Sequence, residues 1–347
     1  MEEWKEYKLG DILNFRRGHD LPHSKMKDGN IPVAGSNGII GYHNEATPVS
    51  PCITIGRSGN VGTPYIYKQC WAHNTVLYVD DFKQNDPLYL YYLLKTLPLS
   101  SFGGGSAVPT LNRNHIHPLI IKHTPNINTQ RQIASILKSL DDKIEVNRRI
   151  NDNLEQQAMA LFDMMFPAVA SGEDIIGNVI IPKRGKGLLS KDAVEGNVPV
   201  VAGGLEPATY HNESNTVAPV VTISASGANA GFVNLWQIPV WSSDSSFIDA
   251  SMTKYVYFWY VMLKKRQKEI FDAQTGSAQP HIYPKHIAEM PMGNFEHSDV
   301  EKFTEIVTPM FEIRGRNLKE SERLASIRDT LLPKLMSGEL KLNEVNV

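Results

Sequence analysis

The most constraining feature of this sequence is an internal duplication, in which residues 32–166 are echoed by residues 199–336. The tetrapeptide Tyr-His-Asn-Glu begins at Tyr42 and returns 168 positions later at Tyr210. The later matches, at offsets of 170 and 171, are Trp71 with Trp241, Pro109 with Pro280 and His115 with His286. An ordered series of matches at one spacing indicates a duplicated architecture, and this period is far too long for a solenoid. We therefore predict two similar domains.

Composition sets milder limits on the class of protein. A chain of 347 residues that is 41% hydrophobic can bury two sizeable cores. Cys52 and Cys70 are the only cysteines and lack the spacing of metal ligands, and there is no signal peptide or long apolar run. These features predict a soluble protein of the reducing cytoplasm. Because the net charge is −2, any surface for nucleic acid must be local.

Each copy divides into a globular part and a long helical part. Residues 1–125 contain short β-type runs separated by Gly, Pro, Asn and Ser, which predicts a strand-rich domain whose one clear helix covers residues 88–97. From Asn128 to Met165, apolar residues recur at steps of three and four, the pattern of one long helix. Such a helix would span on the order of 55 Å. Residues 303–335 repeat the pattern, so we expect the two long helices to pack on each other.

In each long helix the recurring apolar residues form a stripe along one face, and an asparagine interrupts both stripes at the same place. Asn147 and Asn317 are 170 residues apart and lie near the middles of their helices. We expect the two asparagines to approach each other across an antiparallel helix pair and to fix its register, as buried asparagines do in other helix pairs. The alternative is that both side chains face solvent.

Several segments carry a resemblance to one protein family. HIHPLII at residues 115–121 and QRQIASILKSLDDKIEVN at residues 130–147 resemble the spacer of the DNA-specificity subunits of Type I restriction-modification enzymes. LLPKLMSGEL at residues 331–340 is similar to the C-terminus of that family, and YKLGDI at residues 7–12 is similar to its usual opening. The second spacer departs from the pattern, because Arg-Gly-Arg at residues 314–316 stands where the first copy has Ile-Glu-Val. The Pro-rich lead-in of the family is degraded in both copies.

The resemblance implies a fold and a domain order. It implies an α+β chain in which two similar strand-rich α/β target-recognition domains are joined by two long antiparallel helices, which form a coiled-coil-like spacer with pseudo-two-fold symmetry. The expected boundaries are residues 1–125 for the first recognition domain, 126–166 for the first spacer helix, 167–298 for the second recognition domain, and 299–347 for the second spacer helix and the C-terminal tail.

The resemblance also implies a function without catalysis. Each recognition domain would read one half of a split, asymmetric site in double-stranded DNA, and the spacer would set the distance between the halves. Two adenine-methylating subunits would clasp the spacer, and a translocating restriction subunit would join them to make the nuclease. No cofactor is expected in this chain, whereas S-adenosylmethionine would bind the methyltransferase, and ATP and Mg would bind the restriction subunit.

The sequence also lacks the common catalytic motifs. It has no Asn-Pro-Pro-aromatic methyltransferase motif, no Gly-x-x-x-x-Gly-Lys-Ser/Thr phosphate loop and no His-Glu-x-x-His metal motif. His43 and His211 recur at equivalent positions, so a paired catalytic role can be considered. Neither histidine has an acidic or nucleophilic partner at a meaningful spacing, and a structural histidine in a repeated turn is the better interpretation.

Candidate DNA contacts are polar or basic side chains in loops and at strand ends, because base edges require hydrogen-bonding groups and phosphates require positive charge. In the first copy they are Arg16, Arg17, Ser36, Asn37, Arg57, Ser58, Asn60, Asn112, Arg113 and Asn114. In the second copy they are Lys183, Arg184, Lys186, Ser224, Ser226, Asn229, Ser243, Asp244, Gln279 and His281. Each of these residues taken singly is also compatible with an ordinary solvated loop.

The two copies share their motifs but differ at several polar residues in the loops. Arg57 aligns with Ala225 and Arg113 with Pro284, while the motifs around them persist, as two readers of different half-sites require. The first recognition domain is slightly positive and the second slightly negative, so we expect the second to depend more on neutral hydrogen bonds or on its partner subunit. Two other functions stay open: a scaffold that joins partners without reading DNA, and an enzyme with a clustered acid, base or metal site.

Overall fold

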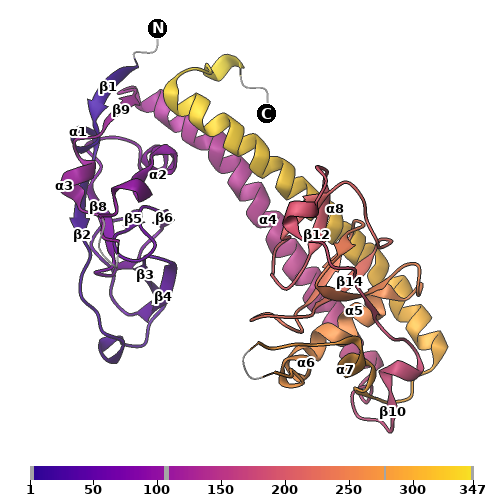
Figure 1. Cartoon of the computed structure of the whole chain (residues 1–347). Helices are drawn as coiled ribbons and strands as arrows, with labels where there is room; N and C mark the ends of the chain where they lie inside the picture. Colours follow the sequence, from indigo (N-terminus) through magenta and orange to yellow (C-terminus); the bar gives the residue numbers. More distant parts are fainter. Residues whose placement is uncertain (1–3, 105–108, 277–278, 345–347) are drawn as a thin grey trace. The chain divides into compact units, whose positions relative to one another are not determined.

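The computed structural model describes residues 4–104, 109–276 and 279–344 (Figure 1). Two compact units divide the chain, Met1–Ile144 with Glu322–Val347 and Glu145–Ser321. The two long helices, α4 (Ile127–Met165) and α8 (His297–Ser337), each contribute to both units. Both helices were predicted from the spacing of apolar residues, and both are confirmed.

The first unit contains nine short strands and three short helices within the described residues. The strands are β1 (Lys5–Lys8), β2 (Asn14–Arg17), β3 (Ile31–Gly35), β4 (Gly38–His43), β5 (Cys52–Gly56), β6 (Pro64–Tyr67), β7 (Trp71–Ala72), β8 (Val76–Asp81) and β9 (Ile120–His123). The helices are α1 (Leu9–Ile12), α2 (Pro87–Thr96) and α3 (Arg113–Ile116), with single 3₁₀ turns at His23–Lys25, Leu99–Phe102 and Leu342–Glu344. The helix predicted at residues 88–97 is α2.

The second unit repeats this set of elements. Its strands are β10 (Asp174–Ile175), β11 (Lys183–Arg184), β12 (Val198–Val201), β13 (Thr209–His211), β14 (Val220–Ser224), β15 (Val233–Trp236), β16 (Trp241–Ser242), β17 (Ser245–Asp249) and β18 (Pro291–Met292). Its helices are α5 (Val256–Lys265), α6 (Gln267–Asp272) and α7 (Pro284–Ala288), with 3₁₀ turns at Ile176–Asn178 and Ser190–Asp192.

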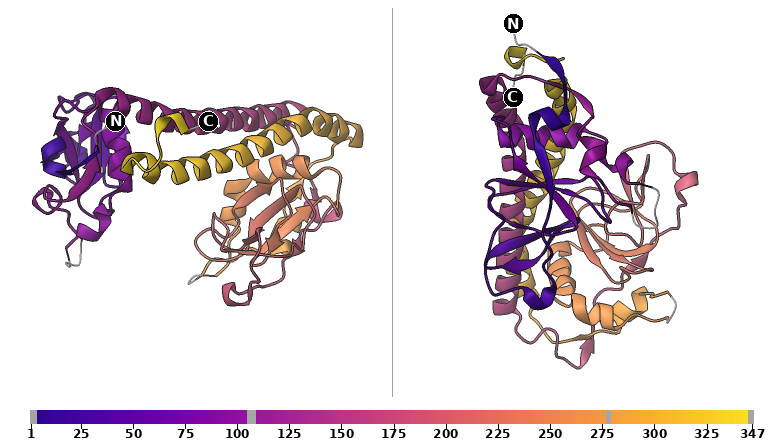
Figure 2. Two further views of the ribbon diagram at one scale, coloured as in Figure 1. Left: turned by 90° about the horizontal axis from the view of Figure 1, so that it is seen from above. Right: turned by 90° about the vertical axis from the view of Figure 1, so that its left-hand side faces the viewer.

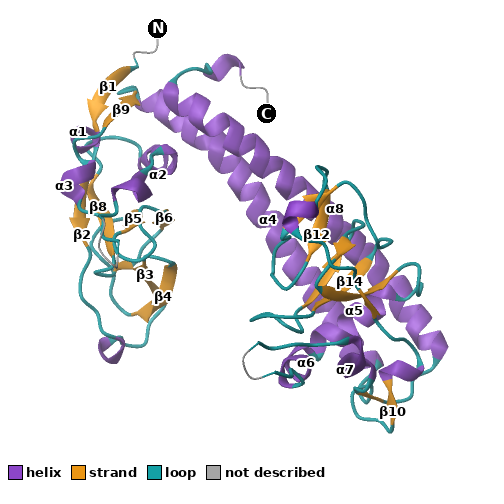
Figure 3. Ribbon diagram, viewed as in Figure 1, coloured by secondary structure: helices purple, strands orange, loops and turns teal. Residues whose placement is uncertain are grey.

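The duplication holds at the level of sheet topology. The four-stranded sheet has the order β2-β8-β5-β6 in the first unit and β11-β17-β14-β15 in the second. The three-stranded sheets, β4-β3-β7 and β13-β12-β16, each join one antiparallel and one parallel pair, and the two-stranded sheets are β1-β9 and β10-β18. Figure 3 shows these strands gathered in the globular part of each unit, while α4 and α8 carry none. The two similar domains predicted from the repeat are therefore present.

Each unit has its own core, in which the central strand is fully buried. β5 and β14 expose none of their five positions, which explains why their sequences are continuous apolar and small residues without alternation. In the second unit, α5 lies between the strands and the long helices (Figure 2). Phe258 of α5 meets Phe162 of α4 with ring centroids 5.6 Å apart, and Phe162 meets Phe303 of α8 at 5.5 Å. This aromatic contact fixes the globular part of the second unit on the helix pair.

The first unit is attached to its helix sections by apolar and polar contacts together. Ile133 and Leu137 of α4 and Leu335 of α8 belong to the same core as α2 and β5. The Tyr92 hydroxyl donates a hydrogen bond to the carboxylate of Asp141 on α4, which also pairs with Arg328 of α8. In this unit α4 and α8 run antiparallel, because the early part of α4 lies against the late part of α8.

Candidate nucleic-acid interface

The most informative surface loops follow the buried central strands. We call residues 57–60, after β5, and residues 225–229, after β14, the strand-end loops. In the first copy the Arg57 amide donates to the carbonyl of Thr75 at 2.8 Å, and the Leu111 amide donates to the Arg57 carbonyl at 2.7 Å. In the second copy the Ala225 amide donates to the backbone carbonyl of Asp244 at 3.1 Å, and the Ile282 amide donates to the carbonyl of Ala225 at 2.9 Å. The same backbone frame therefore presents two different sets of side chains.

A glycine with positive φ turns each strand-end loop. Gly59 has φ of 87° and Gly227 has φ of 82°, a conformation that other residues rarely adopt. A side chain at Gly227 would meet no atom within 4 Å among the described residues, so this backbone lies at an open surface. Ser58 and Ser226, the residues just before these glycines, are half-buried. Such a turn lets a ligand approach the backbone closely.

The first strand-end loop is electropositive. Partial burial and the nearby guanidinium of Arg17 both lower the pKa of Arg57, with burial the larger cause. The Arg57 guanidinium makes one long hydrogen bond, 3.5 Å, to the carbonyl of Asn74. Among the described residues, neither Arg17 nor Arg57 forms an ion pair with a carboxylate. Two arginines with unused donors suit an anionic or acceptor-rich partner.

A carboxylate, that of Asp244 in the turn between β16 and β17, lies beside the second strand-end loop. Arg184 at the end of β11 donates to Asp244 at 2.6 Å, and Ser226 donates to the other oxygen of the same carboxylate. Both side chains of the ion pair remain exposed, Arg184 to 42% and Asp244 to 37%. Arg184, Ser226 and Asp244 were all predicted from the sequence as candidate DNA contacts, but only the structure shows that they lie together.

The other candidates of the first copy are dispersed over the same domain. Arg16 lies 3.7 Å from Asp80, and Arg113 donates to the carbonyl of Phe15 at 3.0 Å. Asn112 caps α3 by accepting from the Asn114 amide at 3.0 Å, and Asn60 accepts from the Thr63 hydroxyl at 3.2 Å. Ser36 and Asn37 form the turn between β3 and β4, and Ser36 lies beside Gly59.

The structure corrects two candidates of the second copy. Ser224 and Ser243 are only 3% and 5% exposed. The Ser224 hydroxyl donates to the Ala202 carbonyl at 3.4 Å, and the Ser243 oxygen accepts from the Leu188 amide at 2.9 Å. A buried hydroxyl that already serves the fold cannot reach a base edge, so the proposed DNA surface omits both serines.

The remaining second-copy candidates are accessible to different degrees. Lys186 lies 6.0 Å from the ring centroid of Trp241, and the His281 ring stacks on Tyr283 with centroids 5.8 Å apart. Lys183 and Gln279 are exposed, and Asn229 is half-buried. These side chains stay in the candidate set.

The repeated histidines have structural partners. His43 accepts from the Lys27 amide at 3.1 Å, and His211 accepts from the Val194 amide at 3.0 Å. Each ring also meets a tryptophan edge to face, His43 with Trp71 and His211 with Trp241. Within the described ranges there is no group of three His, Cys, Asp or Glu residues that could hold a metal ion. The contacts favour the structural interpretation of both histidines.

Sequence reasoning missed Asn74 and Thr75, which form the turn between β7 and β8 against which Arg57 lies. The repeat contained a signal for them. Trp71 matches Trp241, so the turn that follows Trp71 corresponds to the turn after Trp241 that contains Asp244, which was already a candidate.

The two asparagines of the helix stripes lie close together within the second unit. Asn147 is fully buried, and its amide donates to Glu320 at 2.7 Å, to the Ser321 hydroxyl at 3.3 Å and to the Asn317 carbonyl at 3.4 Å. The amide of Asn317 donates to Asn151 at 2.9 Å. The side chain of Asn147 therefore bonds to residues of α8, and the side chain of Asn317 bonds to α4. Among the described residues the two asparagine side chains do not bond directly to each other.

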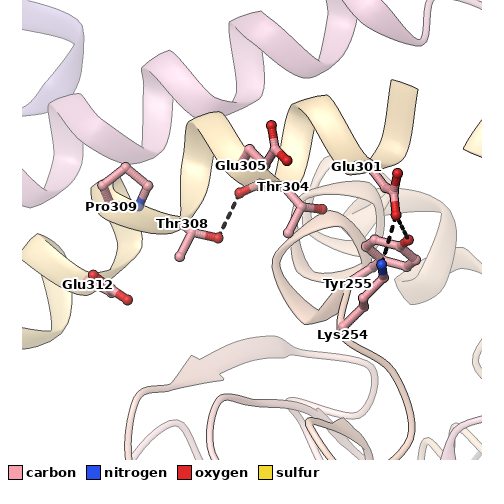
Figure 4. Close-up of a pocket in the computed structure, with 8 residues that line it drawn as sticks. All are labelled: Lys254, Tyr255, Glu301, Thr304, Glu305, Thr308, Pro309 and Glu312. Carbon is pink, nitrogen blue, oxygen red and sulfur yellow. Dashed lines mark hydrogen bonds and ion pairs between the residues drawn. The ribbon is translucent and has the colours of Figure 1, made fainter. Parts of the chain in front are cut away.

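A groove of about 490 Å³ runs along α8 in the second unit (Figure 4). It is lined by Lys254, Tyr255, Glu301, Thr304, Glu305, Thr308, Pro309 and Glu312. Lys254 donates to Glu301 at 2.7 Å, which leaves Glu305 and Glu312 as exposed carboxylates. The groove is acidic.

In the part of the chain that the structure describes, no helix is long and apolar enough to cross a membrane.

Comparisons with known proteins agree on one family. Residues 1–156 match the family model described as the Type I restriction modification DNA specificity domain. A protein of Mycoplasma pneumoniae, provisionally named as a type I specificity subunit, is 25% identical over 363 residues, which cover 96% of each chain. A type I restriction enzyme specificity subunit of Methanocaldococcus jannaschii is 26% identical over 302 residues, which cover 74% of this chain and 70% of that protein.

A solved structure shares the fold. The crystal structure of the Type-I restriction-modification system S subunit from M. genitalium matches with a TM-score of 0.65 and 22% identity, over 96% of each chain. The duplicated topology, the paired long helices and the sequence relatives all lead to the same conclusion. Residues 1–156 match the DNA specificity domain of Type I restriction-modification systems, and the chain as a whole is similar to specificity subunits of such systems.

Proposed function

We propose that this chain selects the DNA site of a Type I restriction-modification complex, with each globular domain reading one half of a split, asymmetric sequence. The observation that carries the proposal is the pair of strand-end loops, which share one backbone frame but differ in charge. Related frames with different polar side chains suit two readers of different half-sites. The chain itself contributes recognition and no catalysis.

The long helices are proposed to hold the two readers at a set distance and to carry the partner subunits. The domain boundaries proposed for these roles are residues 1–125, 126–166, 167–298 and 299–347. Two methyltransferase subunits would dock on the exposed flanks of residues 130–165 and 301–336, and a restriction subunit would join that assembly. S-adenosylmethionine is expected on the methyltransferase, and ATP and Mg on the restriction subunit. Because such a complex acts on cellular DNA, we infer a cytoplasmic location.

The acidic groove along α8 offers a concave surface for such docking in the second unit. Its exposed carboxylates, Glu305 and Glu312, would attract a partner segment rich in Lys or Arg. We therefore propose that a basic segment of a methyltransferase occupies this groove.

Methylome sequencing tests the proposed function. Cells that express the chain with its cognate methyltransferase are compared with cells that express the methyltransferase alone. The expected result is adenine methylation at one split motif that appears only with the chain. An assembled complex that methylates no chain-dependent motif would instead favour a scaffold that does not read DNA.

A further inference from the structure

Each strand-end loop lies against a turn, and the charged side chains in the loop and its turn differ between the two copies. In the first copy, Arg57 lies against the turn His73-Asn74-Thr75, which contains no carboxylate, and Arg17 is near enough to lower the pKa of Arg57. Asp20 lies nearby, but it accepts its hydrogen bond from Asn74. In the second copy, an alanine replaces Arg57, and the corresponding turn supplies Asp244. The charged side chain of the first loop itself, Arg57, is therefore a donor, whereas the turn beside the second loop supplies a charged acceptor.

The carboxylate of Asp244 is held in place and still has acceptor capacity. Arg184 donates to one oxygen at 2.6 Å, and Ser226 donates to the other. A carboxylate has about four lone-pair sites, so these two bonds leave sites unused. The side chain is 37% exposed, so a ligand can reach it. Two partners on different strands and loops fix its direction, which is what a discriminating contact requires.

Few groups in the major groove can donate to a carboxylate. The exocyclic amino groups of cytosine and adenine are the donors there, and Asp or Glu is the usual partner of cytosine N4. Arg184 adds a second preference, because its guanidinium keeps free donors beside Asp244 and arginine is the usual partner of guanine O6 and N7. A cytosine-guanine pair satisfies both side chains together, whereas an adenine-thymine pair offers Arg184 no matched acceptor pair.

From this geometry we infer that Asp244 is a specificity-determining residue that accepts a hydrogen bond from the N4 amino group of a cytosine in the half-site read by the second copy, with Arg184 on the paired guanine. The inference rests on the proposed function and deepens it by naming one base pair. It assigns to Asp244 a base contact, and to Ser226 the role of orienting the carboxylate.

The first test is the methylated motif of an Asp244→Asn variant in the assembled complex. The wild-type motif is expected to contain a cytosine-guanine pair in the half that the variant alters. An amide keeps the shape but can donate to adenine N7 as well as accept, so the variant should admit adenine at that one position and leave the other half-site unchanged. Glu289→Gln is the matched control, because it also replaces an exposed carboxylate by an amide in the second unit and should leave the motif intact.

A second test needs no variant, so it remains decisive if Asp244→Asn fails to assemble. Duplexes containing the wild-type motif are made with each cytosine of either half-site replaced singly by N4-methylcytosine, which blocks the amino hydrogen in the major groove. We expect binding of the complex to weaken about tenfold or more at one cytosine of one half-site, as a lost base contact should. Where the variant assembles, that sensitivity should disappear.

The outcomes separate this inference from the proposed function. A chain-dependent split motif that is unchanged by Asp244→Asn, or that tolerates N4-methylcytosine at every position, would overturn the cytosine contact and leave the function standing. The absence of any chain-dependent motif for the wild-type complex would overturn the function itself.

Discussion

The hydroxyl of Tyr92 donates a hydrogen bond of 2.7 Å to the carboxylate of Asp141, and this bond links the globular part of the first unit to a long helix. Arg328 of the other long helix donates to the same carboxylate at 2.7 Å. The second unit contains a similar arrangement, in which Tyr260 donates to Glu155 and Arg314 lies 3.7 Å from that glutamate. In each unit a buried tyrosine thus joins a carboxylate of α4 that pairs with an arginine of α8.

Removing the Tyr92 hydroxyl should loosen this attachment. Tyr92 is 1% exposed, so Tyr92→Phe leaves the packing intact but removes a hydrogen bond to a charged group. We expect the free energy of unfolding to fall by about 1–2 kcal/mol, measured by urea denaturation. Tyr91→Phe, at the neighbouring half-buried position of α2, is the control. Equal stability of Tyr92→Phe and wild type would show that the bond contributes little.

Replacing Asn147, the buried asparagine of α4, should change the register between α4 and α8 more than it changes the stability of the fold. Asn147→Leu removes an amide whose oxygen has no hydrogen-bond partner, and it places an apolar side chain in a buried site. We expect the free energy of unfolding to fall by about 1–2 kcal/mol, because Glu320 and Ser321 lose the donor that Asn147 provides. Methylome sequencing should at the same time show a second gap length between the half-sites. Asn153→Leu, at an exposed position of the same helix, should keep one gap length. A single unchanged gap in Asn147→Leu would argue against the register role.

Removing Arg57 should relax recognition in one half of the site only. Arg57→Ala deletes the guanidinium that the first strand-end loop presents, and a lost arginine contact to a base costs about 1–3 kcal/mol of discrimination. The methylated motif is expected to become degenerate at one position of the half-site read by residues 1–125. Lys68→Ala removes an exposed charge elsewhere in that unit and should not change the motif. An intact motif in Arg57→Ala would reassign the contact to another residue.

Reversing the charge of the groove on α8 should weaken assembly. Glu305→Arg places a positive charge where a basic partner segment is proposed to bind, and like charges at an interface reduce affinity. We expect the affinity for the methyltransferase, measured by surface plasmon resonance, to fall about tenfold or more. Glu173→Arg, outside the groove, should bind as the wild type does. Equal affinity of both variants would move the docking surface elsewhere on the helices.

The stability of the first unit should depend on pH through His123. Burial lowers the pKa of this histidine from its usual 6.5 to about 4. Because the folded state holds the ring neutral, the stabilisation is complete above pH 6.5 and is lost as pH falls towards 4, by as much as about 3 kcal/mol. Urea denaturation at several pH values should show this slope, and His123→Gln should flatten it. His115→Gln, at an exposed position, should leave the slope unchanged. Equal slopes in His123→Gln and wild type would exclude His123 as the cause.

The sequence by itself determined the duplication, the resemblance to Type I specificity subunits and the two long helices. Repeated motifs and apolar spacing are local patterns, so they can be recognised without knowing what each segment contacts. The helix expected from Asn128 to Met165 begins at Ile127 and ends at Met165 in the structure. The approach of Asn147 to the helix of Asn317 also followed from the repeat, because equivalent positions meet in an antiparallel pair.

Only the tertiary structure decided which polar side chains are available to DNA. Ser224 and Ser243 are residue types common in loops, but both are buried: Ser224 pairs with Ser245 in the sheet, and the Ser243 hydroxyl accepts from the Leu188 amide. Arg184 and Asp244 are separated by 60 residues, and they meet because β11 pairs with β17 in the sheet. Burial and ion pairing at such positions depend on contacts between distant segments, which no local pattern records. The sequence therefore predicted the architecture, whereas the chemistry of the recognition surface required the fold.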